Sequence, residues 1–400
     1  MYLNNLVICS YQRTAFGKFG GALKGINEVE LAFQASQSAL KASKIAPEEI
    51  SSVVGANVVQ SSSNAIYLSR HVGLRLGLPQ ESSALNINRL CGSGFEAFAQ
   101  AAYRILVEKE NAVLLFGTES MSCVPFVLRN ARWGHKLGNT QASDYLMESL
   151  HDEYAQLPMA LTAENLCDQY SLSREEVDAV ALRSQQRTEA AFEKGIFKDE
   201  ICPLTLKQRK KEILFDRDEH PRAGTQMEDL AKLKTLFRSD GVVTAGNASG
   251  MVDGAAAAVL CSEEFAKSRS LPVLAHLRGW ASVGCDPKIM GIGPVPATKL
   301  LLSKMKDSGK SLSISDFKAI EINEAFAPQY LAVERELELD PEKTNVNGGA
   351  IAIGHPLAAT GTRLVGHLAL ELRRRGGGLG LASACIGGGQ GMSLVLEVAS

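Results

Sequence analysis

The sequence predicts an α/β protein built from two similarly wound, layered halves, with a loop-rich insertion in the first half. Three observations support this. Short apolar runs alternate with helical patterns in the first and last parts of the chain, and the middle part is charged and rich in loops. A strand–turn–helix–strand pattern over residues 84–117 also returns over residues 344–384.

The first half is expected to span residues 1–120 and to be completed by residues 244–270. A helix is predicted over 27–43, because Asn27 is a favourable N-cap and Glu30 follows three positions later. Residues 52–60 and 112–116 are short and rich in β-branched or apolar residues, which predicts buried strands. The segment GNASGMVDG, over 246–254, returns to the small-residue composition of the first region.

The insertion is expected to span residues 121–243. Its clearest element is a helix over 173–194, where Ser173 and Glu176 form a capping-box pattern and Gly195 is a stop signal. Residues 207–229 are strongly charged and are expected on the surface.

The second half is expected to span residues 271–400. Within 344–384 the order is N-V-N, a small-residue turn, a helix over 358–375 and the strand LGLASA. The matching pattern over 84–117 predicts that Cys91 and His355 lie at corresponding strand-to-helix turns. Two stretches without charge, 344–362 and 376–396, are interrupted by Gly, Ser, Asn, Gln or Pro. They are therefore interpreted as core and site floor and not as membrane spans.

Composition excludes several classes of function. The 42 Lys and Arg against 44 Asp and Glu give a net charge of -2, which argues against nucleic-acid binding as the main task. The eight cysteines contain no CxxC pair, so neither a structural zinc site nor a disulfide framework is expected. No targeting pattern is recognised in the first ten residues, and a cytoplasmic location is expected by default.

Four loops carry candidate chemistry, and the first holds Cys91. In NRLCGSGF, over 88–95, this cysteine lies at a glycine-flanked turn directly before a helical pattern. The helix N-terminus is expected to lower the pKa of the thiol and to offer free N–H groups to an oxyanion. Taken alone, Cys91 is either a nucleophile or a packing residue.

The other three loops add a base, a second thiol and polar donors. His355 is fixed between Gly354 and Pro356, and histidine is the usual activator of a thiol near neutral pH, although such a residue is also commonly structural. CIGGGQG, over 385–391, combines a thiol with a glycine run that lacks the P-loop and dinucleotide spacings. Asn323 follows an apolar strand and is a candidate to position a water, whereas Glu324 has no expected role beyond capping the next helix.

Together these segments resemble the thiolases, a family of acetyl-CoA acyltransferases. The motifs NRLCGSG, GNASGMVDGAA, NEAFAPQ, GGAIAIGHP and CIGGGQG stand in the thiolase order and cover both halves. Stretches such as SSSNAIYLSRHVGLRLGLP and GCDPKIMGIGPVPA look most like the 3-ketoacyl-CoA thiolases of mitochondrial fatty-acid oxidation. The resemblance implies a thiolase-like αβαβα fold and thiolytic cleavage of 3-ketoacyl-CoA, with the reverse Claisen condensation also open to the enzyme.

The resemblance also implies catalytic roles. By similarity, Cys91 attacks the keto carbon and His355 takes its proton, which leaves an acyl thioester on Cys91. Cys385 protonates the departing enolate, and a second CoA resolves the acyl-enzyme. The N–H groups of Cys91 and Gly387 hold one oxyanion, while His355 and a water on Asn323 hold the other.

Coenzyme A is the implied co-substrate, with no covalently bound cofactor and no metal. By similarity, CoA lies over the insertion, with Ser249 and Met159 near the pantetheine and Arg222 near the nucleotide. The family usually has a serine where this chain has Thr360, and this difference is expected to alter packing more than chemistry. The implied partners are acyl-CoA, CoA, further copies of the chain as a dimer or tetramer, and a β-oxidation enzyme.

Other interpretations remain at this point. One alternative within the family is a short-chain acetyl-CoA acetyltransferase that acts on acetoacetyl-CoA. The nearest enzyme alternative outside it is a condensing enzyme of the same fold, such as a ketoacyl synthase, and it is disfavoured by Cys385, since those enzymes use a second histidine or a glutamate. A non-catalytic thiolase-like CoA-binding protein, and a regulatory disulfide between Cys91 and Cys385, are further alternatives.

Overall fold

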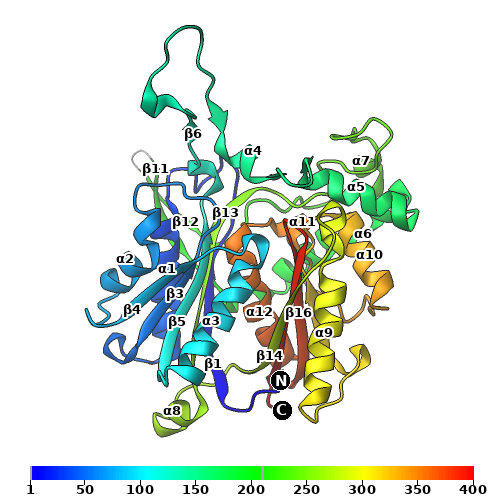
Figure 1. The fold of residues 1–400 in the computed structure, drawn as a ribbon. Helices are drawn as coiled ribbons and strands as arrows, with labels where there is room; N and C mark the ends of the chain where they lie inside the picture. The colour runs from blue at the N-terminus through cyan, green and yellow to red at the C-terminus, as the bar shows by residue number, and fades with distance from the viewer. Residues whose placement is uncertain (1, 209–210) are drawn as a thin grey trace.

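The computed structural model describes residues 2–208 and 211–400. The main strands form one continuous sheet, and its two parts, the first sheet and the second sheet, alternate with layers of helices (Figure 1). The first sheet has the strand order β4-β3-β5-β13-β1, and the second has the order β15-β16-β17-β14. The sheets meet where β1 and β14 pair over residues 7–8 and 275–276. The first sheet consists of β1 (Leu6–Thr14), β3 (Ser52–Ala56), β4 (Ser83–Ile87), β5 (Ala112–Glu119) and β13 (Val252–Ser262); the second consists of β14 (Ala275–Gly284), β15 (Ala319–Ile322), β16 (Gly378–Ile386) and β17 (Gln390–Val398).

The two sheets are wound alike. In the first, β3 runs parallel to β4 and β5, whereas β13 is antiparallel to both β5 and β1. In the second, β15 is parallel to β16, and β17 is antiparallel to both β16 and β14. A parallel bridge between Ile320 and Thr344 takes the place of the β3–β4 pairing. The prediction of two similar α/β halves is therefore confirmed.

Helices cover both outer faces and fill the space between the sheets (Figure 1). The outer helices are α1 (Glu28–Ser43) and α2 (Leu68–Arg75) on the first sheet, and α9 (Pro294–Asp307) and α10 (Ala327–Glu336) on the second. The central pair is α3 (Ser93–Val107) and α12 (Leu357–Arg374). These two helices cross at glycines, since a Cβ at Gly94 would collide with the main chain of Thr362 and one at Gly361 with that of Phe95. Each of the central helices begins directly after a candidate turn.

The insertion lies across the upper end of the two halves (Figure 1). The β6–β7 hairpin projects furthest from the body, and α5 and α6 cover the second half. Its elements are β6 (Phe126–Val127), β7 (Ser143–Asp144), α4 (Tyr145–Ser149), β8 (His151–Asp152), β9 (Leu157–Pro158), α5 (Met159–Tyr170), α6 (Arg174–Glu193), β10 (Ile201–Cys202), β11 (Leu204–Gln208), β12 (Lys211–Phe215) and α7 (Met227–Ala231). Three short elements complete the chain outside it: β2 (Gly17–Lys18), α8 (Glu263–Ser268) and α11 (Ala350–Ile353).

Helix ends follow the predicted signals closely. The Asn27 side chain accepts a hydrogen bond from the main-chain N–H of Glu30 at the start of α1. At the start of α6, Ser173 and Glu176 form the predicted capping box, and Gly195 follows the helix with φ 69°. Here local capping chemistry and tertiary structure agree.

Two expectations about the chain are wrong in detail. The strand predicted over 52–60 ends at Ala56, because the groups of residues 57–59 are directed to a buried carboxylate instead of a neighbouring strand. The charged segment 207–229 is not surface throughout, since Asp218 is buried and forms a two-contact ion pair with the buried Arg13. A buried guanidinium needs such partners, and they come from the insertion.

Candidate active site

Cys91 lies in a 3-10 turn, Leu90–Gly92, at the point where α3 begins. Leu90 has φ 48°, a left-handed conformation that is unusual for a branched residue. The turn is held because Asn88 Oδ1 accepts from Leu90 N at 2.9 Å and Ser93 Oγ donates to Leu90 O at 2.7 Å. The turn therefore presents Cys91, partly exposed, at the entrance to the central helix pair.

The electrostatics of Cys91 differ from the expectation. Burial of the sulfur raises the pKa of this thiol to about 11, and the N–H groups of Gly387 and Cys91 offset only part of that rise. The charge of Glu119 raises the pKa further. The expectation of a lowered thiol pKa is wrong, because burial outweighs the effect of the helix N-terminus. The resting thiol is protonated at neutral pH.

His355 is held rigidly at the corresponding turn before α12. Gly354 has φ 97°, and its main chain lies against Val252. His355 N donates to Gly250 O at 2.9 Å. Burial, followed by the cation of Arg363, lowers the pKa of His355 to about 3. The imidazole is therefore neutral and available as a proton acceptor at physiological pH.

Two side chains orient the imidazole of His355. Its Nδ1 lies 2.6 Å from Thr360 Oγ1, and its Nε2 lies 3.4 Å from Asn323 Nδ2. With the amide of Asn323 directed this way, Nε2 is the acceptor and Nδ1 carries the proton. Thr360, expected to alter packing more than chemistry, also places its hydroxyl in direct contact with the ring of His355, which the sequence did not predict.

Asn323 and Glu324 follow β15 and serve different purposes. Asn323 is fully buried, and its Oδ1 has no hydrogen-bond partner among the described residues. Glu324 does not cap α10. Its carboxylate accepts from Ser184 Oγ at 2.6 Å, Asn345 Nδ2 at 2.9 Å and Ile351 N at 3.3 Å. Glu324 therefore ties α6 to the segment that leads into His355, while Asn323 leaves an oxygen free for a water.

The glycine loop after β16 closes the site from the other side. Cys385 is buried against Met290 and Ala325. Burial raises the pKa of the Cys385 thiol above its usual range, and the neighbouring sulfurs of Cys91 and Cys285 raise it further. The structure therefore brings the two predicted catalytic thiols close to each other.

Gly387 and Met159 both lie beside Cys91. A Cβ at Gly387 would lie 3.3 Å from Leu90 Cδ1 and 3.4 Å from Met159 Sδ. These distances are short, so the glycine loop, the start of α5 and the turn of Cys91 are close neighbours. Ser249 reaches the same region, because its N–H donates to Ala325 O at 3.0 Å.

Arg222 lies apart from these residues. It lines a cavity of about 270 Å³ together with His220, Ile351 and Gly246. His220 Nδ1 is bonded to Ala352 O at 2.7 Å, which places this cavity against α11 and the segment leading to His355. The predicted CoA contacts thus fall into two groups, one beside Cys91 and one in this cavity.

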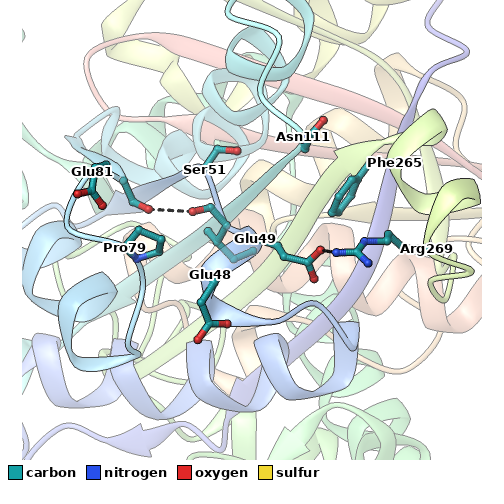
Figure 2. Close-up of a pocket in the computed structure, with 10 residues that line it drawn as sticks. Glu48, Glu49, Ser51, Pro79, Glu81, Asn111, Phe265 and Arg269 are labelled. Atoms are coloured by element: carbon teal, nitrogen blue, oxygen red, sulfur yellow. Dashed lines mark hydrogen bonds and ion pairs between the residues drawn. The ribbon is translucent and has the colours of Figure 1, made fainter.

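A larger cavity of about 490 Å³ contains none of the predicted site residues. Figure 2 shows it lined by Glu48, Glu49 and Glu81, with Arg269 paired to Glu49. An open, acidic hollow repels phosphates, so it does not suit a nucleotide. Within residues 2–208 and 211–400, no group of three or more metal-ligating side chains is found, and no helix has the length and apolar character to cross a bilayer.

Comparison with known proteins agrees with this geometry. Residues 6–264 match the thiolase N-terminal domain and residues 271–398 match the thiolase C-terminal domain. The chain is 51% identical to the human mitochondrial 3-ketoacyl-CoA thiolase, covering 99% of this chain and 98% of that one. It is 46% identical to an acetyl-CoA acetyltransferase of Pseudomonas aeruginosa, and the match covers 98% of this chain and 99% of that one. The crystal structure of the human enzyme in complex with CoA has a TM-score of 0.94 at 50% identity, with 99% and 98% covered.

The expectation of a cytoplasmic location is wrong, because it is contradicted by the mitochondrial location in the name of the human relative. The expectation rested on the composition of the first ten residues. In the fold, Leu6, Val7 and Ile8 belong to the buried strand β1, so their sequence reflects the core and carries no information about location. Matching domains over both halves, a matching structure and identity over nearly the full length show that this chain belongs to the thiolase family.

Proposed function

We propose that this protein is a 3-ketoacyl-CoA thiolase, which cleaves 3-ketoacyl-CoA with CoA to give acetyl-CoA and a shortened acyl-CoA. One observation carries the proposal: the turns of Cys91, His355 and Cys385, from separate parts of the chain, meet around one site beside the unpartnered oxygen of Asn323. A thiol, a neutral base and a second thiol are the groups that carbon–carbon cleavage through an acyl-enzyme requires.

The protonation states fit this chemistry. Cys91 is a thiol and His355 a neutral imidazole, so the proton of the thiol passes to Nε2 as sulfur bonds to the keto carbon. The carbon–carbon bond then breaks, and its electron pair leaves as the enolate of acetyl-CoA. Cys385 supplies the proton that this enolate needs. The thiol of a second CoA then attacks the acyl thioester and releases Cys91.

Two oxyanion sites support these steps. The N–H groups of Cys91 and Gly387 face the same sulfur, where the oxygen of the acyl group develops charge. The imidazole of His355 and a water on Asn323 Oδ1 are suited to hold the enolate oxygen. Each such donor contributes about 3–4 kcal/mol to transition-state stabilisation in enzymes where one has been removed.

The CoA path runs from the cavity of Arg222 to Cys91. The cation of Arg222 suits the nucleotide phosphates, and Met159 and Ser249 lie where the pantetheine approaches the thiol. The human relative has been solved in complex with CoA, which supports CoA as the co-substrate.

The chain organisation is assigned as three units: 1–120 with 244–270, the insertion 121–243, and 271–400. The ends of β5 and α8 and the starts of β13 and β14 support these limits. We further propose a homo-oligomer, dimer or tetramer. Large apolar side chains on the projecting hairpin are strongly exposed, Trp133 by 87% and Leu137 by 98%, and such exposure is typical of an interface.

The test is CoA-dependent thiolysis by the purified protein over a series from acetoacetyl-CoA to 3-ketododecanoyl-CoA, with kcat/KM for each. Turnover of the longer chains is the expected result. Turnover of acetoacetyl-CoA alone would instead assign a short-chain acetyltransferase, and no turnover of any member would overturn the proposal. Light scattering of the same sample checks the oligomer, which a monomeric mass would contradict.

A further inference from the structure

A buried carboxylate outside the proposed catalytic set lies between the two catalytic turns. Glu119 is the last residue of β5, and its side chain is fully buried. The preceding residues of the strand are apolar or small. Burying a carboxylate costs free energy unless hydrogen bonds replace its water, so its partners define its purpose.

Each oxygen of Glu119 accepts two hydrogen bonds. Oε1 accepts from Asn57 Nδ2 at 2.8 Å and from Val59 N at 2.9 Å. Oε2 accepts from Val58 N at 3.3 Å and from Ala358 N at 3.2 Å. Three of the four donors are main-chain groups, so Glu119 fixes backbone in two distant segments.

One of these segments is the first turn of α12, three residues after His355. Early N–H groups of a helix have no intrahelical acceptor, and Pro356 at the N-cap offers no side chain to satisfy them. Glu119 therefore caps α12 from the opposite half of the molecule. The two backbones are in close contact here, because a Cβ at Gly117 would collide with Ala358 O.

The other segment leads to Cys91. Val58, which donates to Glu119 through its N–H, accepts through its carbonyl from Asn88 Nδ2 at 3.1 Å. Asn88 Oδ1 in turn accepts from Leu90 N at 2.9 Å. A continuous set of hydrogen bonds thus runs from the turn of Cys91, through Glu119, to the turn of His355.

We propose that Glu119 is a positioning residue for the thiolase reaction, whose carboxyl group sets the placement of the Cys91 turn relative to the His355 turn. This inference rests on the proposed function. Glu119 contacts no reacting atom; it acts through the two turns that carry them.

Opposing effects act on the carboxyl group of Glu119. Burial raises the pKa of Glu119 to about 8, its three main-chain donors lower it, and the carboxylate of Glu28 raises it. The charge of Glu119 in turn raises the pKa of Cys91. Glu28 is the natural comparison, because its buried carboxylate is bound by the hydroxyls of Ser61 and Ser62, which belong to neither catalytic turn.

The test compares Glu119→Gln with Glu28→Gln. In Glu119→Gln an amide NH2 faces two N–H donors, so two of the four hydrogen bonds are lost without a change of shape. We expect kcat for thiolysis, per Cys91 titrated by acylation, to fall about tenfold or more, with KM for CoA unchanged, since misplacing catalytic groups lowers turnover strongly. Glu28→Gln should keep kcat within about twofold of the parent, because its serine hydroxyls can rotate to donate or accept.

Asn88→Ala tests the same link without a change in the core. We expect a smaller loss of kcat than in Glu119→Gln. The double variant Glu119→Gln/Asn88→Ala should be no slower than Glu119→Gln alone, because both substitutions interrupt the same set of hydrogen bonds. Unchanged kcat per titrated site in Glu119→Gln, equal loss in Glu28→Gln, or multiplying losses in the double variant would each overturn the inference. If Glu119→Gln does not fold, an unchanged kcat in Asn88→Ala overturns it. A parent protein without thiolysis would overturn the proposed function as well.

Discussion

The first turns of α3 and α12 occupy corresponding places in two similar halves, yet they hold their side chains differently. Cys91 lies in a strained 3-10 turn and is partly exposed. His355 is only 6% exposed and is oriented by Thr360 and Asn323. The difference shows that corresponding turns of two similar halves can meet different requirements. The nucleophile must be reached by substrate, whereas the base must stay neutral and aligned.

The two helices are also anchored differently. The ion pairs of α3 reach solvent, as between Arg104 and Glu108, whose side chain is 57% exposed. α12 also has partly exposed pairs near its end, but its Arg363 forms a buried pair with Glu321. His367 of α12 contacts the buried Glu200, which is shared with Arg13. Buried charges therefore tie the helix that begins after His355 to the insertion, whereas the pairs described for α3 lie near the surface.

The largest expected effect is on the nucleophile. Cys91→Ala removes the sulfur proposed to form the acyl-enzyme, so turnover should fall by about 10⁴-fold or more. Binding of CoA should persist, because its proposed contacts lie elsewhere. Thiolysis rates and intact mass after incubation with acyl-CoA measure both effects. Cys123→Ala, in the insertion, is the control, and acylation retained in Cys91→Ala would contradict the assignment.

The second effect concerns stability. Glu200→Ala removes the carboxylate that the buried His367 contacts and one carboxylate partner of the buried Arg13, which keeps its pair with Asp218. The free energy of unfolding should fall by about 3–5 kcal/mol. Glu108→Ala, which breaks an exposed pair on α3, should cost less than about 1 kcal/mol. Urea unfolding at pH 7 measures both. Equal losses would contradict the difference in anchoring.

The same carboxylate predicts a pH dependence. Burial alone would raise the pKa of Glu200, but the charges of His367 and Arg13 outweigh it and lower the pKa to about 2. A lowered carboxyl pKa stabilises the fold above its ordinary value of 4.5, and that stability is lost as pH falls toward 2. The difference between the parent and Glu200→Ala should therefore shrink in unfolding curves taken below pH 4.5.

The third effect tests whether burial or the helix N-terminus has the larger influence on the pKa of the Cys91 thiol. With a pKa of about 11, the thiolate fraction of Cys91 rises about tenfold with each pH unit. Alkylation of Cys91 by iodoacetamide, followed by peptide mapping, should therefore speed up about 100-fold between pH 7 and pH 9. An alkylation rate that stops rising below pH 9 would show that the helix N-terminus lowers the pKa of Cys91 more than burial raises it.

The smallest effect concerns the base. Thr360→Val keeps the shape but removes the hydroxyl bonded to His355 Nδ1, and should lower kcat about tenfold. Thr360→Ser keeps the hydroxyl and should stay within about twofold of the parent. A full kcat in Thr360→Val would return this residue to a packing role.

Much of the fold was readable from local patterns. The caps at Asn27 and Ser173 and the matching patterns over 84–117 and 344–384 depend on neighbours in sequence, which a single chain reveals. The end of β3 could not be predicted, because residues 57–59 are turned away by a carboxylate 60 positions later in the chain. Asp218 was misplaced for the same reason, since its partner Arg13 lies in β1.

Site residues that lie within sequence motifs could be predicted, whereas those that act through tertiary contacts could not. The glycine-flanked turns pointed to Cys91, His355 and Cys385. The hydrogen bond between Thr360 and His355 depends on how the chain bends at Pro356, and no periodic pattern in the sequence indicates that bend. Glu119 offered one signal, a carboxylate at the end of an apolar strand, but its donors come from two distant segments.

The glycine crossing of α3 and α12 has a consequence for how substrate enters. Because the two backbones touch at Gly94 and Gly361, no side chains lie between them that could slide or repack. We therefore expect the two halves to move little relative to each other where these helices cross. Entry of the substrate should then depend on movement within the insertion. The mobility that limits turnover should therefore be sought in hydrogen exchange of residues 121–243 and not in the core.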